Sequence, residues 1–435
     1  LDILRIRNYY LADDSDEGET EISNTIKVIQ LGEKTLGRSL LTLLTSWTPP
    51  SSLKNNKAPN GGTISYDPTN IMDYHYQQYG TWWTESLIHY QSLGVYPEYL
   101  SIQTEPNNDT EEHPSMKLEP FQQKENGIAG YNMAIEAAVQ EMKLDDRIVD
   151  LPKFIGPDTL NFDEYQDGSD EACPIDVYIG NLVFTSTIYA WAHHLYYDHL
   201  STSNPDALND KMENFASHFS DKPIFITEYY NKDVMNDDAN SDSEGRTWER
   251  LWHYAKVMHN ALTLENASAF FYKNLYGNED ALVSLPDDEH YVVNPEYYAF
   301  KHYTAFIEQE SIRIVVSTEE SGVFISAFAS ASANKMTLVI LNENVDAVTL
   351  NMDFDSISIM SGEIYSSTRK GRKCEKIGNF EPADDRKQFE VDGESITTLY
   401  LDYVSPYGIK DSAYYMNFHS DYMNSYSDSG NWGSR

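Results

Sequence analysis

Two segments of strand length each end in a glutamate, and these glutamates are the residues best placed to do chemistry. Glu105 lies near the end of residues 99–106 and Glu228 near the end of residues 223–230, each after an apolar run. A carboxylate at the C-terminal end of a buried parallel strand is where barrel enzymes place catalytic groups. One such glutamate could simply end its strand in solvent. Two of them, on separate strands, predict the paired acids of a glycoside hydrolase.

A pair of this kind would need one carboxyl group that is protonated at rest and one that is ionised, about 5–5.5 Å apart in a retaining enzyme. Arg5, at the end of the first predicted strand, could be the positive partner of the ionised group, or could pair with a surface acid. Aromatic residues at predicted strand ends could stack on sugar rings, although 32 tyrosines make some such placements inevitable. These aromatic residues are Trp47, Tyr196, Tyr229, Tyr230 and Tyr272.

Nothing in the sequence indicates a cofactor or a metal. There is no phosphate-binding loop, no Gly-x-Ser-x-Gly elbow and no spacing typical of metal ligands. His193 and His194 are adjacent on a predicted strand, where neighbouring side chains point to opposite faces, so they cannot both face one site. We therefore predict a site built on carboxylates, without cofactor or metal.

A barrel would bring these strand ends together. From residue 1 to about 310, strand-like runs alternate with helical patterns, for example near residues 70–93 and 121–142, which predicts parallel βα units. We count seven units, one short of a (β/α)8 TIM barrel. The missing first unit is most simply upstream of Leu1, with closure by seven strands as the other option. Because the chain begins without Met, we expect a fragment or a processed product.

After about residue 310 the pattern changes to short alternating strands, which predicts an antiparallel β-sandwich. We assign residues 1–310 to the barrel, 311–405 to the sandwich and 406–435 to a Ser/Tyr-rich tail. The composition of that tail is typical of a disordered segment or a linker, although its aromatic residues could dock on a surface.

The charge balance of 31 − 69 = −38 argues against nucleic acid or an anionic membrane as a partner. No apolar stretch is long enough to cross a membrane. We expect a secreted, acidic protein that acts on an uncharged oligo- or polysaccharide. Asn108 and Asn266 fit the N-glycosylation pattern. With only Cys173 and Cys374 there is no disulfide framework, and their pairing is open.

Several short motifs, in order along residues 1–403, resemble glycoside hydrolase family 30. That family contains xylanases, β-glucosidases, glucosylceramidases and β-1,6-glucanases, built as a (β/α)8 barrel with a β-sandwich. The motifs are Leu-Arg-Ile-Arg-Asn at residues 4–8, Ser-Trp-Thr-Pro-Pro at 46–50, Ile-Gln-Thr-Glu-Pro at 102–106, His-Leu-Tyr at 194–196 and Thr-Glu-Tyr at 227–229.

The resemblance implies specific roles. Glu105 would be the general acid/base and Glu228 the nucleophile, with Arg5 bonded to the nucleophile. Trp47 would line the subsite next to the cleaved bond, and His194 and Tyr196 would neighbour the nucleophile.

Three positions depart from the family pattern. Thr104 stands where the family has an asparagine whose amide contacts the sugar 2-hydroxyl. The last barrel strand carries Phe270, Phe271 and Tyr272 where a tryptophan is usual, and residues 272–276 lack the arginine that glucuronoxylanases use. The departure at residues 272–276 argues against glucuronoxylan and leaves plain xylan, β-glucan or a β-glucoside.

Two functional interpretations follow. We favour a retaining β-glycosidase that cleaves a β-glycan by double displacement, with a xylan-type substrate preferred over β-glucan or a β-glucoside. The alternative is a catalytically weak or inactive relative that binds glycans or serves as a structural part of an assembly. Thr104, the altered last strand and the tail motivate the alternative, whereas the two glutamates support activity.

Overall fold

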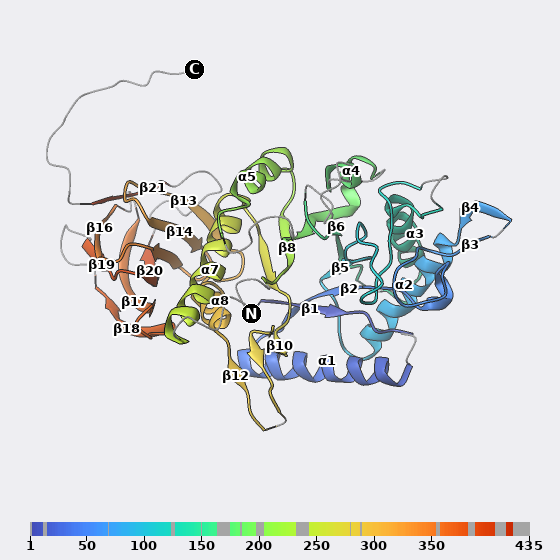
Figure 1. Cartoon of the computed structure of the whole chain (residues 1–435), viewed down its shortest axis with the longest axis horizontal. Coiled ribbons are helices and arrows are strands. Elements are labelled where there is room, and N and C mark those ends of the chain that lie inside the picture. Colours follow the sequence, from blue (N-terminus) through green and yellow to red (C-terminus); the bar gives the residue numbers. More distant parts are fainter. Residues whose placement is uncertain are drawn as a thin grey trace, which may run out of the picture. The chain divides into compact units, whose positions relative to one another are not determined.

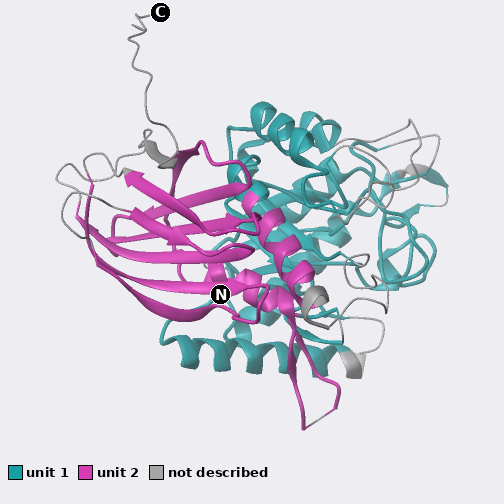
Figure 2. Ribbon diagram, turned by 60° about the vertical axis from the view of Figure 1, so that its left-hand side comes forward, with its two compact units in different colours: residues 1–235, 260–281 teal, residues 236–259, 282–435 magenta. Residues whose placement is uncertain are grey.

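The fold is described from a computed structural model of the whole chain (Figure 1). It describes residues 2–11, 15–67, 69–122, 127–148, 150–162, 175–182, 185–196, 204–231, 243–278, 280–287, 289–353, 357–381, 388–404 and 415–420. The chain divides into two compact units, residues 1–235 with 260–281 and residues 236–259 with 282–435 (Figure 2). Within the described residues, no helix has both the length and the apolar character needed to span a membrane.

The first unit is organised around a nearly closed parallel barrel, as the sequence predicts. Its sheet has seven strands among the described residues, in the order β1-β2-β5-β6-β7-β8-β9, and every neighbouring pair is parallel. Chain order and spatial order therefore agree around the sheet. The strands are β1 (Ile3–Arg7), β2 (Leu41–Thr45), β5 (Tyr99–Ser101), β6 (Lys153–Thr159), β7 (Ile188–His194), β8 (Ile224–Tyr229) and β9 (Ala269–Tyr272).

Helices alternate with the strands along the chain, and the helix α2 shows why they form. Its buried residues Tyr79, Trp83, Leu87 and Tyr90 recur at three- and four-residue spacing, which places them on one face. The helices are α1 (Ser15–Leu36), α2 (Tyr76–Ser92), α3 (Tyr131–Leu144), α4 (Ile175–Gly180), α5 (Asn209–His218), α7 (Ser243–Thr263) and α8 (Pro295–Thr304), with short 3-10 turns at Ser51–Leu53 and Thr185–Thr187.

The barrel interior is filled at one level by apolar side chains from all seven strands. Leu43, Tyr99, Ile155, Ala190, Ala192, Phe225 and Phe271 are buried together, and Ile3, Leu41 and Ala269 pack against them. This packed layer closes the barrel below the strand C-termini, so polar groups at those termini share one end of the barrel.

The predicted β-sandwich is also present, in the second unit. One nine-stranded sheet, in the order β18-β17-β20-β15-β14-β13-β21-β16-β19, surrounds a single apolar core that includes Leu338, Leu350 and Leu399. Its pairs are antiparallel except β13 with β21. The strands are β13 (Ile312–Thr318), β14 (Val323–Ser330), β15 (Lys335–Asn342), β16 (Val348–Asp353), β17 (Ser358–Thr368), β18 (Glu375–Phe380), β19 (Gln388–Val391), β20 (Ser395–Val404) and β21 (Tyr415–Ser420).

Several local predictions need correction. Residues 70–74 form β4 (Asn70–Tyr74), paired with β3 (Tyr66–Asp67), so α2 begins only at Tyr76. The helix predicted from residue 121 begins at Tyr131, because Gly130 is in a bridge with Glu119. Short strands β10 (Tyr276–Gly277), β11 (Val283–Ser284) and β12 (Val292–Val293) follow β9.

The predicted tail and the two cysteines fall partly outside the described residues. Residues 415–420 of the Ser/Tyr-rich segment form β21, which pairs with β13 and β16. That part of the tail is therefore incorporated in the sheet, whereas residues 406–414 and 421–435 lie outside the described residues. Cys374 is a buried free thiol, and Cys173 lies outside the described residues.

Candidate active site

The segment that carries Glu105 is anchored from two sides. The backbone oxygen of Ile102 accepts hydrogen bonds from Tyr79 Oη at 2.6 Å and Trp83 Nε1 at 3.2 Å, so α2 fixes the end of β5. Two residues further on, the amide N–H of Thr104 donates to the oxygen of Ser46 at 2.8 Å. The backbone is therefore held before it turns at Glu105.

Glu105 itself has a left-handed backbone conformation, with φ of 47°. Such a conformation is uncommon for a residue other than glycine and is found where surrounding contacts enforce it. Here the Glu105 N–H donates to the backbone oxygen of Asp158 at 2.7 Å, and the Asn108 N–H donates to the Glu105 oxygen at 2.9 Å. The turn aims the Glu105 side chain at the end of β7.

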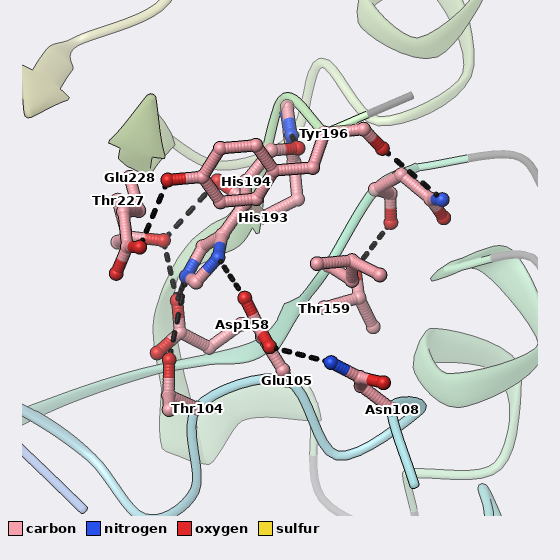
Figure 3. A network of polar contacts seen from close by, with 12 residues as sticks. Thr104, Glu105, Asn108, Asp158, Thr159, His193, His194, Tyr196, Thr227 and Glu228 are labelled. Atoms are coloured by element: carbon pink, nitrogen blue, oxygen red, sulfur yellow. Dashed lines mark hydrogen bonds and ion pairs between the residues drawn. The ribbon is translucent and has the colours of Figure 1, made fainter. Parts of the chain in front are cut away.

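The Glu105 carboxylate has two polar partners (Figure 3). His194 Nδ1 lies 3.0 Å from Oε1, and Asn108 Nδ2 donates to Oε2 at 2.9 Å. The Glu105 side chain is 13% exposed, so the group is buried but open to a ligand. His194 and His193 point to opposite sides of β7, as predicted, since His193 contacts the buried Glu265 instead.

Glu228 lies at the end of β8 and is 4% exposed. Arg5 Nη1 donates to Glu228 Oε2 in a close ion pair, and Tyr196 Oη donates to Oε1 at 2.9 Å. Burial and the nearby charges of Glu228 and Glu105 raise the pKa of Tyr196 well above its ordinary value, so its hydroxyl remains a donor. Both oxygens of Glu228 thus receive hydrogen bonds from fixed side chains.

The two glutamates come together, as the strand-end pattern predicts. One oxygen of Glu105, one oxygen of Glu228 and one ring nitrogen of His194 lie within 4.8 Å of one another. This is also a spacing that a metal ion could bridge. However, Arg5 already contacts Glu228, and a protonated His194 has no lone pair to offer a metal, so the set is better suited to proton chemistry.

A third carboxylate, Asp158, lies beneath this pair and is fully buried. It is the second-last residue of β6 and has a left-handed conformation with φ of 65°. Ser101 Oγ donates to it at 2.7 Å and Thr227 Oγ1 donates from β8. Asp158 also lies 3.8 Å from Arg5 Nη2 and 3.5 Å from His194 Nε2.

Thr104 occupies the space between the two cations. Arg5 Nη2 donates to Thr104 Oγ1 at 2.6 Å, and His194 Nε2 lies 3.3 Å from the same oxygen. Thr104 is 7% exposed. Its hydroxyl is therefore a member of the internal network.

The charges in this network shift the pKa values in opposite directions. Burial lowers the pKa of His194, but the charges of Glu228, Asp158 and Glu105 outweigh it and raise that pKa to about 9. Burial raises the pKa of Glu105, yet its bond to the charged His194 brings the net pKa below the ordinary value. For Asp158, His194 and Arg5 likewise outweigh burial and lower the pKa. The expectation that one carboxyl of the pair is protonated at rest is therefore not met by Glu105, because the charged His194 favours its ionised form.

The remaining predicted residues lie at the same end of the barrel with different surroundings. Trp47 follows β2 and is half-buried, with Arg7 over its ring at 4.9 Å. Tyr229 is 6% exposed and packs edge-on against Phe270, which favours a packing role. Tyr272 ends β9, half-buried, with its ring 6.4 Å from that of Tyr230. Substrate binding by Trp47, Tyr229 and Tyr272 stays a prediction.

Sequence reasoning missed two members of the network. No motif along the chain singles out Asp158, although β6 places it beside Arg5 and His194. Asn108 was noted only as a possible glycosylation site. Its side-chain nitrogen, the atom that a glycan would modify, donates to Glu105, so a glycan there would adjoin the carboxylate. Asn266 is exposed, and glycosylation of either asparagine stays a prediction.

Comparison with known proteins bears on the fold. No protein-family model matches the chain, and no curated protein matches it in sequence. Solved structures do match. A glycoside hydrolase family 30 subfamily 8 xylanase from Clostridium acetobutylicum aligns at a TM-score of 0.63 and 20% identity, covering 92% of this chain and 89% of that chain.

Two further structures agree with this match. The catalytic domain of a family 30 xylanase from Talaromyces cellulolyticus aligns at a TM-score of 0.68 and 16% identity, covering 92% of this chain and 88% of that chain. An endo-β-1,6-glucanase aligns at a TM-score of 0.62 and 15% identity, covering 92% of this chain and 83% of that chain. The chain has the fold of glycoside hydrolase family 30, a barrel with an attached β-domain.

Proposed function

We propose that this protein is a retaining β-glycosidase in which Glu228 is the nucleophile and Glu105 the general acid/base. The observation that carries the proposal is the spacing of the two carboxylates, with one oxygen of each within 4.8 Å. Retaining glycosidases have carboxyl groups about 5–5.5 Å apart, whereas inverting enzymes need about 6.5–9.5 Å to admit a water molecule. The spacing therefore supports direct attack on the sugar.

The surroundings of each carboxylate support the assignment of roles. Glu228 accepts hydrogen bonds from Arg5 and Tyr196, and this fixed, positively charged setting suits a carboxylate nucleophile. Glu105 instead contacts His194, a group that can hold and return a proton. In the first step Glu228 would bond to the anomeric carbon while Glu105 protonates the departing oxygen. In the second step Glu105 would take a proton from water as that water attacks the glycosyl ester.

The substrate we propose is a β-glycan, with xylan-type chains preferred and β-glucan or a β-glucoside as further options. The aligned structures include two xylanases and an endo-β-1,6-glucanase, and at 15–20% identity their specificities supply only candidates. An uncharged polysaccharide also suits a protein with a net charge of −38. A polysaccharide outside the cell is a substrate for a secreted enzyme, which is consistent with our prediction that the protein is secreted.

The experiment is a proton NMR time course on a panel of aryl β-glycosides and on short xylo- and gluco-oligosaccharides. A retaining enzyme releases the β-anomer first, before mutarotation produces the α-anomer. Glu228→Gln, which keeps the shape of the side chain without its charge, should abolish release while leaving sugar binding in place. An α-anomer as first product would overturn the retaining mechanism.

One observation favours the alternative of an inactive or weak glycan-binding relative. The Thr104 hydroxyl accepts from Arg5 and adjoins His194, so it is already engaged in the internal network. If the contact to the sugar 2-hydroxyl that the resemblance implies is missing, catalysis would be slower by roughly 10²–10³-fold. The panel distinguishes the two functions. A binding protein would bind glycans, as measured by calorimetry, and would give no turnover on any member of the panel.

A further inference from the structure

Asp158 is placed to act on the active site without reaching its ligand. Its side chain has no exposed surface, and near the end of β6 its Oδ1 lies 3.5 Å from His194 Nε2. Hydroxyl groups of Ser101 and Thr227 donate to its carboxylate. Hydroxyl donors satisfy a carboxylate without neutralising it, so Asp158 remains a fixed negative charge inside the barrel.

His194 has a carboxylate oxygen near each of its ring nitrogens. Nδ1 faces Glu105 Oε1 at 3.0 Å, and Nε2 faces Asp158 Oδ1 at 3.5 Å and Thr104 Oγ1 at 3.3 Å. A neutral imidazole has one N–H, whereas the imidazolium has two, so only the charged ring can donate to both carboxylates. The Tyr196 ring packs edge-on against it at 5.7 Å.

The charged groups around His194 favour that state. Glu105 from the end of β5, Asp158 from β6 and Glu228 from β8 supply three negative charges, and Arg5 from β1 supplies one positive charge. The sum of these neighbours is −2. This excess of negative charge outweighs burial, in agreement with the pKa of His194 of about 9.

We propose that Asp158 is a positioning residue whose buried charge keeps a proton on His194, so that His194 is the proton reservoir of Glu105. The inference rests on the proposed glycosidase function for its catalytic meaning. Glu105 is ionised at rest, and the proton needed by the departing oxygen is stored 3.0 Å away on Nδ1. Asp158 holds the ring through Nε2, on the side away from Glu105.

The proton step balances as follows. Glu228 forms its bond to the anomeric carbon while the bond from that carbon to the departing oxygen breaks, and the departing oxygen keeps the electron pair. The Nδ1 proton moves to Glu105 and from there to that oxygen, which leaves His194 neutral and Glu105 ionised. In the second step water attacks the glycosyl ester, Glu105 takes a proton from that water and passes it to Nδ1. Glu228 regains its charge, and the resting state returns.

Formation of the ester also favours transfer of the proton from His194 to Glu105. Glu228 loses its negative charge when it becomes part of the ester, and that charge is one of those that hold the proton on His194. The affinity of His194 for the proton therefore falls in the step in which the proton must leave. Asp158 supplies the constant part of the field, and Glu228 supplies the part that changes during turnover.

The test is a titration of His194 in the resting protein by NMR of ¹⁵N-labelled histidine, with its signals assigned by their loss in His194→Gln. We expect a pKa near 9, with both ring nitrogens protonated at neutral pH. Asp158→Asn should lower that pKa by roughly 1–3 units, because one neighbouring charge is lost. Asparagine tolerates the left-handed backbone of residue 158, so the substitution adds no backbone strain there.

Ser101→Ala is the matched control, since it removes one hydrogen bond to Asp158 and leaves the charge in place. It should leave the pKa of His194 near its wild-type value. An Asp158→Asn protein with an unchanged pKa of His194 would overturn the proposal. If Asp158→Asn does not fold, the wild-type titration decides, because a His194 pKa at or below the ordinary 6.5 contradicts a reservoir.

Kinetics separate this inference from the proposed function. In active protein, the basic limb of the kcat/KM profile should move to lower pH in Asp158→Asn and stay in place in Ser101→Ala. A protein that shows the expected titration without turnover would refute the glycosidase and keep the charge assignment. A protein that hydrolyses glycosides with a neutral His194 would refute the reservoir and keep the glycosidase.

Discussion

Replacement of Arg5 by methionine is the perturbation whose size follows most directly from the structure. Arg5 contacts Glu228 through Nη1 and Thr104 through Nη2, and Nη2 lies 3.8 Å from Asp158. At an effective dielectric constant of about 20, two unit charges 3.8 Å apart attract by about 4 kcal/mol. Arg5→Met removes the desolvation cost of the guanidinium, but it leaves buried carboxylates without their positive partner. We therefore expect a net loss of about 3–5 kcal/mol in unfolding free energy.

Arg5→Lys is the matched control for this experiment. It keeps the positive charge, but a single ammonium cannot reproduce the two donors that reach Glu228 and Thr104 together. We expect a smaller loss of stability, about 1–2 kcal/mol, for one hydrogen bond to a charged network. In activity, Arg5→Met should lower kcat by roughly 10²–10³-fold, as expected for removal of one electrostatic partner of the reacting group.

The assay is urea unfolding at pH 7, in which the midpoints of the variant and the wild type are compared at constant m-value. The kcat/KM on an aryl glycoside is measured alongside. The stability deficit of Arg5→Met should shrink in acid. Burial raises the pKa of Asp158, but His194 and Arg5 lower it below the ordinary 3.8, so its stabilisation is present above pH 3.8 and lost as the pH falls further. An Arg5→Met protein within about 0.5 kcal/mol of wild type at pH 7 would refute this account of the buried charges.

Three further predictions concern single residues. Thr104→Asn should raise kcat/KM by up to roughly 10²-fold on substrates with a free 2-hydroxyl and leave 2-deoxy substrates unaffected, if the contact implied by the resemblance limits the rate; equal effects on both would contradict it. Asn108→Ala removes the donor to Glu105 Oε2 and should slow glycosides with poor leaving groups more than activated aryl glycosides, measured as a kcat/KM ratio. His302 is buried between Thr398 and Ser367, and burial lowers its pKa from 6.5 to about 3. Its neutral form therefore contributes full stability above pH 6.5, and up to roughly 4–5 kcal/mol is lost as the pH falls from 6.5 toward 3; His302→Gln should flatten that acid slope in urea titrations.

The sequence was sufficient for the barrel strands and for the two glutamates because their signals are local. A buried parallel strand is apolar on both faces, and a carboxylate at its end interrupts that run visibly. Residues 99–101 and 224–229 follow this rule, and their strands end beside Glu105 and at Tyr229. Asp158 also lies near the end of such a strand, but no motif along the chain singles it out.

Other features depend on contacts that are distant in the sequence. Residues 70–74 fit a helical pattern, yet they form β4 because β3 offers a partner. Strand β21 lies within a segment of low-complexity composition and pairs with β13 and β16, which lie far earlier in the chain. Thr104 gained its place in the site from Arg5 on β1 and His194 on β7, which periodicity along one segment does not reveal.

The most direct test of the central claim is to trap the covalent intermediate. In an activated 2-deoxy-2-fluoro-β-xyloside or β-glucoside the fluorine slows both steps and the good leaving group restores the first, so a glycosyl-enzyme accumulates. We predict that peptide mass spectrometry will find the fluorosugar on Glu228 of the wild-type protein and no adduct in Glu228→Gln. An adduct on another residue, or its persistence in Glu228→Gln, would contradict the account.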